Sequence, residues 1–325
     1  MNRFFRALTV FAGVLGFFTS AAAQSYPSRP ITVIVPFPPG GATDVLARFL
    51  GERLRETLGQ PVVIENVSGA AGTLGVGRAV RALPDGYTVS VGTSTTHMLT
   101  GGLYALPFDI LNDLDPVILI GSEPLMILGK KTLPADNLAE LIAWLKANPE
   151  RASVGLAGVG AIGHLTGLAF QKETGTRYQF IPYRGNAPVV QGLVSGQIDF
   201  VIEPSSNYYS QVRAGTVKAF AVTAKQRLGV LPQVPTTDEV GLPGFYASVW
   251  FGVWVPKGTP KDIVTKLNGV FVETFAKSEV QQSLAEKGLT LVPREQQTPE
   301  TLRAYQKEEA ARWWPIIKSA NIKAE

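Results

Sequence analysis

Side chains able to carry covalent chemistry are few in this chain. Its 325 residues include no cysteine and two histidines, His97 and His164. The lack of cysteine excludes a thiol nucleophile, a disulfide framework and a cysteine metal cluster. A metal site or a histidine-based triad would need both histidines to converge with carboxylates, and their spacing does not indicate this. We expect each histidine to form hydrogen bonds or to begin a helix.

Two carboxylates could form a catalytic pair. Asp199 and Glu203 lie on or beside an expected strand over residues 198–202. Carboxylates at strand ends more often orient loops by accepting hydrogen bonds from N–H groups, and we favour that role. The motifs G-x-S-x-G, H-E-x-x-H and G-x-x-x-x-G-K-[ST] are absent from the sequence. Because no nucleophile–base pair is evident, the sequence predicts that the protein is not an enzyme.

One motif could indicate a cofactor. Residues 158–163, GVGAIG, match the dinucleotide pattern G-x-G-x-x-G between an expected strand and an expected helix. The next strand ends at residues 181–184, IPYR, without an acidic residue placed to hold a ribose hydroxyl. Arg184 could face a 2′-phosphate, so an exported dinucleotide-using enzyme stays an alternative. A single match is a weak signal, and we expect no cofactor.

The chemistry that the sequence favours is anion binding by backbone N–H groups. Residues 31–50, ITVIVPFPPGGATDVLARFL, begin as an apolar run typical of a strand buried on both faces. The chain then turns at Gly40-Gly41 into a helical pattern that Thr43 or Asp44 can cap. N–H groups at the start of a helix lack internal partners, and with the helix dipole they can bind a carboxylate or phosphate. Three later segments repeat this order of strand, glycine-rich loop and helix.

The alternation of strands and helices predicts an α/β fold with parallel sheets covered on both faces. We expect the chain to cross between two domains near residues 115–125 and 228–248. The first domain would then be discontinuous, formed by residues 24–120 and 236–325, and the second would span residues 121–235. The glycine loops would face each other across a cleft.

The first 23 residues have the features of a secretory signal. Arg3 and Arg6 precede an apolar run over residues 7–18, and three alanines end at Ala23. We expect cleavage near Ala23 and a periplasmic protein. Without Arg3 and Arg6 the chain carries 28 basic and 26 acidic residues. This near balance argues against nucleic acid or a membrane surface as a partner.

With these motifs laid out, the chain resembles the Bug family, the periplasmic receptors of tripartite tricarboxylate transporters. The resemblance covers residues 24–325 in eight ordered segments. These segments are VPFPPGGATDVLAR (35–48), GQPVVIENVSGAAGTLG (59–75), PDGYTV (84–89), GHL (163–165), IPYRG (181–185), GQIDF (196–200), VPTTDEVGLPG (234–244) and GTPKDIVTKLN (258–268). The chain departs from the family pattern at Ile181 and Arg184, where the family commonly has Val and Lys, and its loop over residues 66–68 lacks the arginine and proline often seen there.

The resemblance implies a type II periplasmic binding protein fold, with two α/β domains and a cleft that closes on its ligand. It also implies a small carboxylate ligand, which could be an amino acid, a di- or tricarboxylate or an aromatic carboxylate, and membrane permease subunits as partners. With Thr93 from the polar loop over residues 92–97, the expected ligand-binding residues are Phe37, Pro38, Gly40, Gly41, Thr43, Asp44, Ser68, Ala70, Gly72, Gly158, Gly160, Ala161, His164, Tyr183, Arg184, Gly185 and Asp199.

Within this expectation we assign provisional roles. Gly40, Gly41 and residues 158–161 supply N–H donors, and Phe37 and Tyr183 shape the walls, which favours planar or aromatic acids slightly. Arg184 can grip a second acid group with two-pronged geometry. We expect a monomer. A signalling receptor that docks a sensor protein stays an alternative, because the sequence does not separate the two kinds of docking partner.

Overall fold

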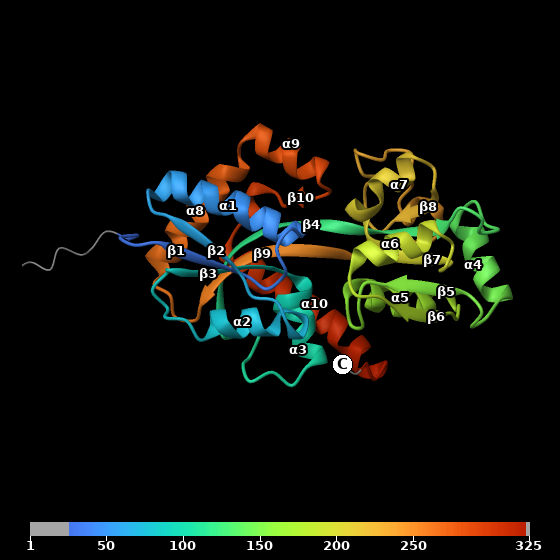
Figure 1. The fold of residues 1–325 in the computed structure, drawn as a ribbon, viewed down its shortest axis with the longest axis horizontal. Helices are drawn as coiled ribbons and strands as arrows, with labels where there is room; N and C mark the ends of the chain where they lie inside the picture. Colours follow the sequence, from blue (N-terminus) through green and yellow to red (C-terminus); the bar gives the residue numbers. More distant parts are fainter. Residues whose placement is uncertain (1–25, 323–325) are drawn as a thin grey trace, which may run out of the picture.

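The computed structural model describes residues 26–322, so the expected signal segment, residues 1–23, lies outside the described residues. Two sheets share one long strand, β4 (Leu114–Lys130). The first sheet joins it to β1 (Ile31–Val35), β2 (Val62–Asn66), β3 (Thr88–Thr93), β9 (Ser248–Pro256) and β10 (Thr290–Leu291). The second joins it to β5 (Ser153–Leu156), β6 (Gln179–Pro182), β7 (Phe200–Pro204) and β8 (Val217–Val222). We call the two halves the first and second lobes (Figure 1).

Helices cover both sheets, as the alternating sequence pattern predicts. The first lobe carries α1 (Ala42–Leu58), η1 (Ala70–Gly72), α2 (Thr73–Val80), η2 (Thr95–Leu99), α3 (Thr100–Leu103), α8 (Lys261–Phe275), α9 (Ser278–Glu286), η5 (Arg294–Gln296) and α10 (Pro299–Ser319). The second carries α4 (Leu138–Ala147), α5 (Ile162–Thr174), α6 (Asn186–Val194), η3 (Ser205–Tyr208), α7 (Tyr209–Arg213) and η4 (Asp238–Val240).

The core of the first lobe follows from the apolar run at β1. Val33 pairs in parallel with Ile64 of β2 and Val89 of β3, and the strand is almost fully buried. Leu46 and Leu50 of α1 pack into the same cluster. Removing such side chains from water supplies most of the stability of a parallel sheet buried on both faces. The expectation that Trp250 and Trp254 are core residues is confirmed, because both are buried on β9.

Two antiparallel strands connect the lobes. β4 and β9 pair over their whole common length, from Leu114 with Pro256 to Pro124 with Ser248, and lie side by side between the lobes (Figure 1). Before β9 the chain still lies against the second lobe, since the Thr237 N–H donates to the Val222 carbonyl at 3.0 Å. The return to the first lobe therefore comes near Ser248, although the predicted domain limits themselves stay a prediction.

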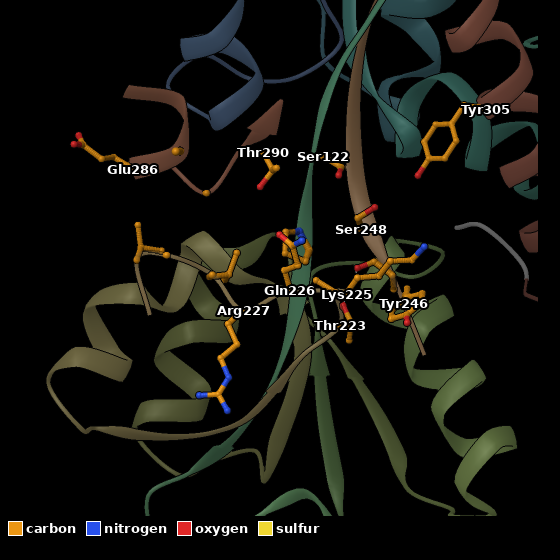
Figure 2. Close-up of a pocket in the computed structure, with 18 of the residues that line it drawn as sticks. Ser122, Thr223, Lys225, Gln226, Arg227, Tyr246, Ser248, Glu286, Thr290 and Tyr305 are labelled. Carbon is orange, nitrogen blue, oxygen red and sulfur yellow. Dashed lines mark hydrogen bonds between the residues drawn. The ribbon is translucent and has the colours of Figure 1, made fainter. Parts of the chain in front are cut away.

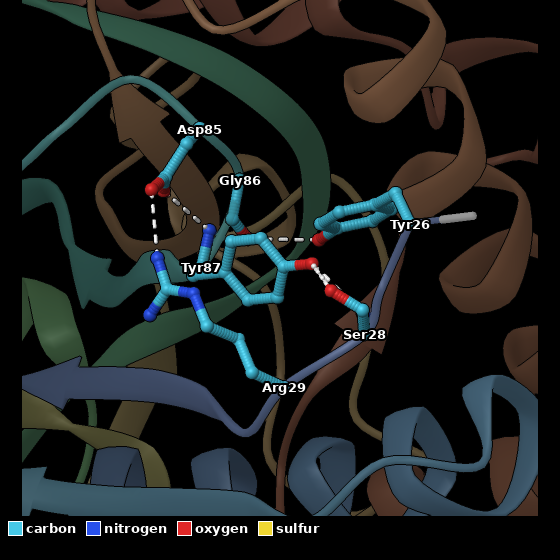
Figure 3. A network of polar contacts seen from close by, with 6 residues as sticks. All are labelled: Tyr26, Ser28, Arg29, Asp85, Gly86 and Tyr87. Atoms are coloured by element: carbon cyan, nitrogen blue, oxygen red, sulfur yellow. Dashed lines mark hydrogen bonds and ion pairs between the residues drawn. The ribbon is translucent and has the colours of Figure 1, made fainter. Parts of the chain in front are cut away.

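The described chain begins with a polar anchor at the end of the first sheet where β1 and β3 start. Arg29 forms an ion pair with Asp85 at 2.7 Å and lies over the Tyr87 ring. The Tyr26 hydroxyl donates to the Gly86 carbonyl at 2.8 Å, and the Ser28 N–H donates to the Tyr87 hydroxyl at 2.8 Å (Figure 3). This anchor secures the entry of β1 into the sheet. None of the helices in residues 26–322 has the length and apolar character needed to cross a membrane.

The packing of α2 allows a test of the fold. A Cβ at Gly75 would lie 2.6 Å from the Val67 carbonyl oxygen and 2.9 Å from Cα of Pro36, which are backbone atoms that cannot move aside cheaply. We expect Gly75→Ala to lower the free energy of unfolding by about 1–3 kcal/mol, measured by urea denaturation. The control is Gly269→Ala in α8, where a Cβ meets nothing within 4 Å. It should raise stability by about 0.5–1 kcal/mol, and equal effects of the two changes would contradict the packing argument.

Candidate ligand-binding site

The predicted loops come together at one edge of each sheet. β1 is parallel to β2 and β3, and β5 is parallel to β6 and β7, so the loops that follow these strands gather at their carboxyl ends. Figure 1 shows that β1 runs toward the second lobe and β5 runs back toward the first. The loop after β5 approaches the first lobe, because a side chain at Gly160 would meet Leu103 of α3.

Asp44 organises the first-lobe loop. Its Oδ2 accepts from the Gly40 N–H at 2.9 Å and from Arg48 Nε at 3.0 Å, and its Oδ1 accepts from Asn66 Nδ2 at 2.9 Å. Asn66 Nδ2 also donates to the Phe37 carbonyl at 3.1 Å. The hydrogen bond from Arg48 lowers the pKa of Asp44 to about 2, aided by the Gly40 and Asn66 donors. A single buried carboxylate therefore ties the loop, the helix and the end of β2 together.

This geometry corrects the expectation that Thr43 or Asp44 is the N-cap of α1. The N-cap of α1 is Gly41, which has no side chain to cap with, and Thr43 and Asp44 lie inside the first turn. Asp44 instead reaches back to the Gly40 N–H, so this expected donor is already used. Among the described residues, the N–H groups of Ala42, Thr43 and Asp44 have no hydrogen-bond partner. These three groups are therefore free to donate hydrogen bonds to an anion.

The loop between β2 and α2 is strained. Gly69, Ala70, Ala71 and Gly72 all have positive φ, at 123°, 46°, 52° and 90°. The left-handed conformation costs an alanine roughly 1–2 kcal/mol, and such strain tends to occur at ligand-binding segments. Glycine is required at position 72, because a Cβ there would lie 2.5 Å from Thr96 Cγ2. Ser68 and Ala70 are exposed at this edge of the sheet.

His97 belongs to the core of the first lobe. It is fully buried and stacks on Trp254, with ring centroids 4.0 Å apart. Its Nε2 and Nδ1 form hydrogen bonds with the hydroxyls of Ser90 and Thr96, both at 2.9 Å. Burial lowers the pKa of His97 to about 3, so the ring is neutral at physiological pH. Thr93 ends β3 beside it and is also buried.

In the second lobe the donors again come from a helix start. The Gly160 N–H donates to His164 Nδ1 at 3.1 Å, and the Ala161 N–H donates to the Gly158 carbonyl at 3.2 Å. These two expected donors are therefore used inside the loop, which corrects the prediction for residues 158–161. His164 is buried against Phe180, and burial lowers its pKa. The N–H groups of Ile162, Gly163 and His164 in the first turn of α5 have no partner within residues 26–322.

Two buried glutamates hold neighbouring loops of the second lobe. Glu203 Oε1 accepts from the Ala157 N–H at 3.0 Å, and Glu123 Oε1 accepts from the Ser206 N–H at 2.7 Å. Desolvation raises the pKa of Glu203 to about 8 and also raises the pKa of Glu123. The interpretation of Glu203 as a loop-orienting carboxylate is confirmed by its hydrogen bond. The sequence did not predict the role of Glu123. This residue reaches the loops of the second lobe only because β4 passes from one lobe to the other.

Asp199 lies away from the glycine loops. It precedes β7, where its Oδ2 accepts from the Ser153 N–H at 2.8 Å and its Oδ1 pairs with Lys130 at 2.6 Å. Glu203 lies four positions further along the chain, near the other end of the strand, which corresponds to about 13 Å. The structure thus places Asp199 at the opposite edge of the sheet from the other expected residues. Glu203, and not Asp199, is the carboxylate that lies beside the loops.

The loop after β6 lies beside the loop after β5. The N–H groups of Tyr183 and Gly185 donate to the carbonyls of Leu156 and Ala157 at 2.9 and 3.2 Å. The Tyr183 ring packs over Gly192 of α6, since a Cβ there would lie 2.7 Å from its hydroxyl. Tyr183 is thus engaged in packing within its own lobe. Arg184 is exposed and forms no ion pair with any described acid.

On the first lobe, Phe37 is half-buried against the core cluster, and Pro38 and Gly41 are exposed beside it. A cavity of about 440 Å³ adjoins Gly40 and Ala42 at the start of α1 and reaches Glu123 on β4. The rest of its lining comes from α1, β9, α9 and the turn that follows α9, and it is largely apolar. This cavity therefore borders Gly40, one of the expected first-lobe residues.

A separate cavity of about 630 Å³ lies where the lobes join and contains none of the expected site residues. Figure 2 shows Glu286 and Thr290 on one side of it and Gln226 and Arg227 on the other. Its arginines are already engaged, because Arg227 pairs with Glu239 at 2.9 Å and Arg312 Nη2 donates to the Tyr246 carbonyl at 2.5 Å. Lys225 also lines this cavity, but none of the unpaired N–H groups at the starts of α1 and α5 does. No group of three or more metal-ligating side chains occurs in residues 26–322.

Two lobes joined by paired strands, each with helix starts at the carboxyl ends of its parallel strands, are typical of two-lobed solute-binding receptors. The sequence description of the tripartite tricarboxylate transporter family receptor, TctC, matches residues 46–322. The chain belongs to this family, and the predicted membership and the periplasmic-binding-protein fold are confirmed.

Three proteins illustrate the similarity. Protein BugT of Bordetella pertussis is 36% identical over 325 residues, covering 99% of each chain. The structure of MatC from Rhodopseudomonas palustris with bound malate matches with a TM-score of 0.79 and 35% identity, covering 90% of this chain and 100% of that one. The structure of R. palustris Rpa4515 with adipate matches with a TM-score of 0.81 and 33% identity, covering 92% and 99%. The family and these structural relatives are binding proteins.

Asp44→Asn tests the first-lobe network. We expect it to lower the free energy of unfolding by about 1–3 kcal/mol at pH 7, because buried donors lose a charged acceptor. The pKa of Asp44 is depressed to about 2, so its stabilising charge is present above pH 4 and lost as the pH falls through about 2. The difference between the two proteins, measured by urea denaturation, should shrink over that interval.

Asp262→Asn is the matched control, since Asp262 also lies in the first turn of a helix but is exposed and forms no side-chain hydrogen bond among the described residues. Its effect should stay within about 0.5 kcal/mol. Equal losses in the two variants, or a loss in Asp44→Asn that does not change at low pH, would show that the network does not stabilise the loop.

Proposed function

We propose that this protein is a periplasmic receptor that captures a small carboxylate between its lobes and delivers it to the permease of a tripartite tricarboxylate transporter. The observation that carries the proposal is the set of unpaired N–H groups in the first turns of α1 and α5. Both turns follow the carboxyl ends of parallel strands, where α/β proteins bind ligands. Export with cleavage near Ala23 is part of the proposal and is supported by the family's periplasmic role.

The proposed binding mode needs no buried cation. Backbone N–H groups and the positive end of a helix dipole are fixed in place, so they hold an anion without the cost of reorganising a side chain. Asp44 does not oppose the ligand strongly, because Arg48 and Asn66 already compensate its charge. Ordered waters could bridge the remaining distance and let one site accept related acids.

A diacid fits the second lobe best. Arg184 is exposed beside the start of α6 and has no acidic partner in the described part of the chain. Its guanidinium group is therefore available for bidentate hydrogen bonds to a second carboxylate. The malate and adipate bound by MatC and Rpa4515 are both dicarboxylates, which supports this choice. An aromatic ligand has less support, because Tyr183 packs on Gly192 and Phe37 packs on the core of its own lobe.

Ligand capture is proposed to close the two lobes as domains, with limits near those predicted from the sequence. The hinge would lie where β4 and β9 cross, near Gly121–Pro124 and Ser248. The ligand favours the closed state only through contacts that it makes with both lobes at once. A monomer suits this shuttling role, and no catalytic step is proposed.

Thermal unfolding against matched acids and amides tests the proposal. The mature chain is mixed with succinate, malate, adipate, citrate, glutamate and benzoate, each beside its amide analogue. A ligand at about 100 times its dissociation constant stabilises the folded state by about 2.7 kcal/mol, which gives a clear rise in melting temperature. We expect a rise with at least one diacid and none with its diamide. Equal rises with acid and amide would contradict carboxylate recognition.

Arg184→Ala separates diacids from monoacids. Hydrogen bonds to charged groups contribute about 1.5–3 kcal/mol, so the variant should bind the preferred diacid roughly 10- to 150-fold more weakly. Affinity for the corresponding monoacid should stay unchanged, as measured by isothermal titration calorimetry. Arg177→Ala is the control, because Arg177 is an exposed arginine of the same lobe, and it should leave both affinities unchanged. Full diacid affinity in Arg184→Ala would remove this residue from the site.

A further inference from the structure

A second-lobe carboxyl group lies directly beneath the helix start that the proposed ligand uses. Glu203 lies one residue before the end of β7, is 1% exposed, and accepts a hydrogen bond from the Ala157 N–H at 3.0 Å. Position 163 must be glycine, because a Cβ there would collide with the Glu203 carboxyl group. The acid therefore touches both the beginning of the loop and the first turn of α5. The inference below deepens the proposed function and rests on it.

The charge of this acid decides what the helix start can bind. α5 is a 13-residue helix, and three first-turn N–H groups have no partner among the described residues. A carboxylate is stabilised near a helix N-terminus, as is an external anion. An ionised Glu203 would therefore compete with the ligand for the same partial positive charge and would repel it. A neutral Glu203 leaves that charge to the ligand and still accepts from Ala157.

The packing around Glu203 favours the neutral form. Among residues 26–322 it accepts one hydrogen bond, from the Ala157 N–H, and no basic side chain forms an ion pair with it. The nearby Tyr208 hydroxyl is buried without a partner. A buried carboxylate with so few donors is costly, and the group takes up a proton instead.

Other ionisable groups face β7 from each packed element. His164 lies on α5, Tyr208 on η3 and Glu123 on the paired strand β4. Lys130 and Asp199 pair with each other at the far end of the strand. Burial lowers the pKa of His164 and raises the pKa of Tyr208, so neither group changes charge between pH 7 and 9. Among the groups on these elements, Glu123 is the other carboxyl group with a raised pKa, and the test must separate it from Glu203.

We propose that Glu203 is a positioning residue that holds the second-lobe loop in its neutral form, so that capture of the acidic ligand requires a proton on this side chain. Burial raises the pKa of Glu203 to about 8, which places the change of charge just above neutral pH. Binding should weaken as the pH rises through that value. One coupled proton gives at most about a tenfold loss of affinity per pH unit.

The experiment measures dissociation constants for malate and adipate from pH 6.5 to 9.5 by isothermal titration calorimetry. The wild-type protein should lose at least tenfold in affinity across this range. Glu203→Gln keeps an acceptor for the Ala157 N–H and cannot ionise, so its affinity at pH 6.5 should be near wild type and change less than about threefold up to pH 9.5. Glu203→Gln with the wild-type pH profile would overturn the proposal.

Two further variants make the result specific. Asp199→Asn changes an acid of the same lobe at the opposite edge of the sheet and should keep the wild-type pH profile. Glu123→Gln should keep it too, and loss of the pH dependence in this variant instead of Glu203→Gln would overturn the assignment. Wild-type binding with a flat profile would overturn the inference alone. No binding of any carboxylate at pH 6.5 would overturn the proposed function and the inference with it.

Without ligand, the proton on Glu203 can be followed through stability. A carboxyl group whose pKa is raised in the folded state stabilises it at low pH, and this contribution is lost as the pH rises through the folded-state pKa. The melting temperature of the wild-type protein relative to Glu203→Gln should therefore fall between about pH 4.5 and pH 8 and then level off. A constant difference would overturn the assignment of a neutral Glu203, whether or not the variant binds ligand.

Discussion

Unpaired backbone N–H groups at helix starts are the constraint on which this architecture depends. The first turn of a helix cannot satisfy its own donors, so these groups must face water, a capping side chain or a ligand. In α1 and α5 no side chain caps the helix, since the N-cap residues are Gly41 and Ala161. The parallel strands before these helices deliver both starts to sheet edges, and the fold concentrates positive partial charge there.

In both lobes, carboxyl groups accept hydrogen bonds from the loops at the sheet edges, but these groups differ in their protonation state. Asp44 is compensated by Arg48 and Asn66, which keep it ionised. Glu203 and Glu123 accept from backbone N–H groups without a basic partner in the described chain, and burial raises the pKa of both. Under the proposed function, an acid that touches a ligand-binding helix start must be either compensated or neutral. This is why the protonation state of Glu203 bears on the proposed ligand capture.

The paired strands β4 and β9 connect the two lobes. β4 contributes to both sheets, so one continuous strand belongs to both lobes. Adjacent residues of a strand face opposite sides, and this separates the cavity bordered by Glu123 from the cavity bordered by Ser122. The two cavities therefore lie on opposite faces of β4.

Local pattern in the sequence was enough to predict the strands, the glycine loops, the helices and the family. Apolar runs such as Ile31–Val35 and ordered motifs such as VPFPPGGATDVLAR act through neighbouring residues, and these relations survive in the fold. Tertiary structure alone decided which groups meet. It showed that the N–H groups of Gly40 and Gly160 are used internally, that Asp199 lies at the far edge, and that Glu123 and Glu203 support neighbouring loops. Local periodicity indicates which face a residue occupies, whereas hydrogen-bond partners and desolvation depend on strand register and on residues distant in sequence, such as Glu123 and Ser206, which are 83 positions apart.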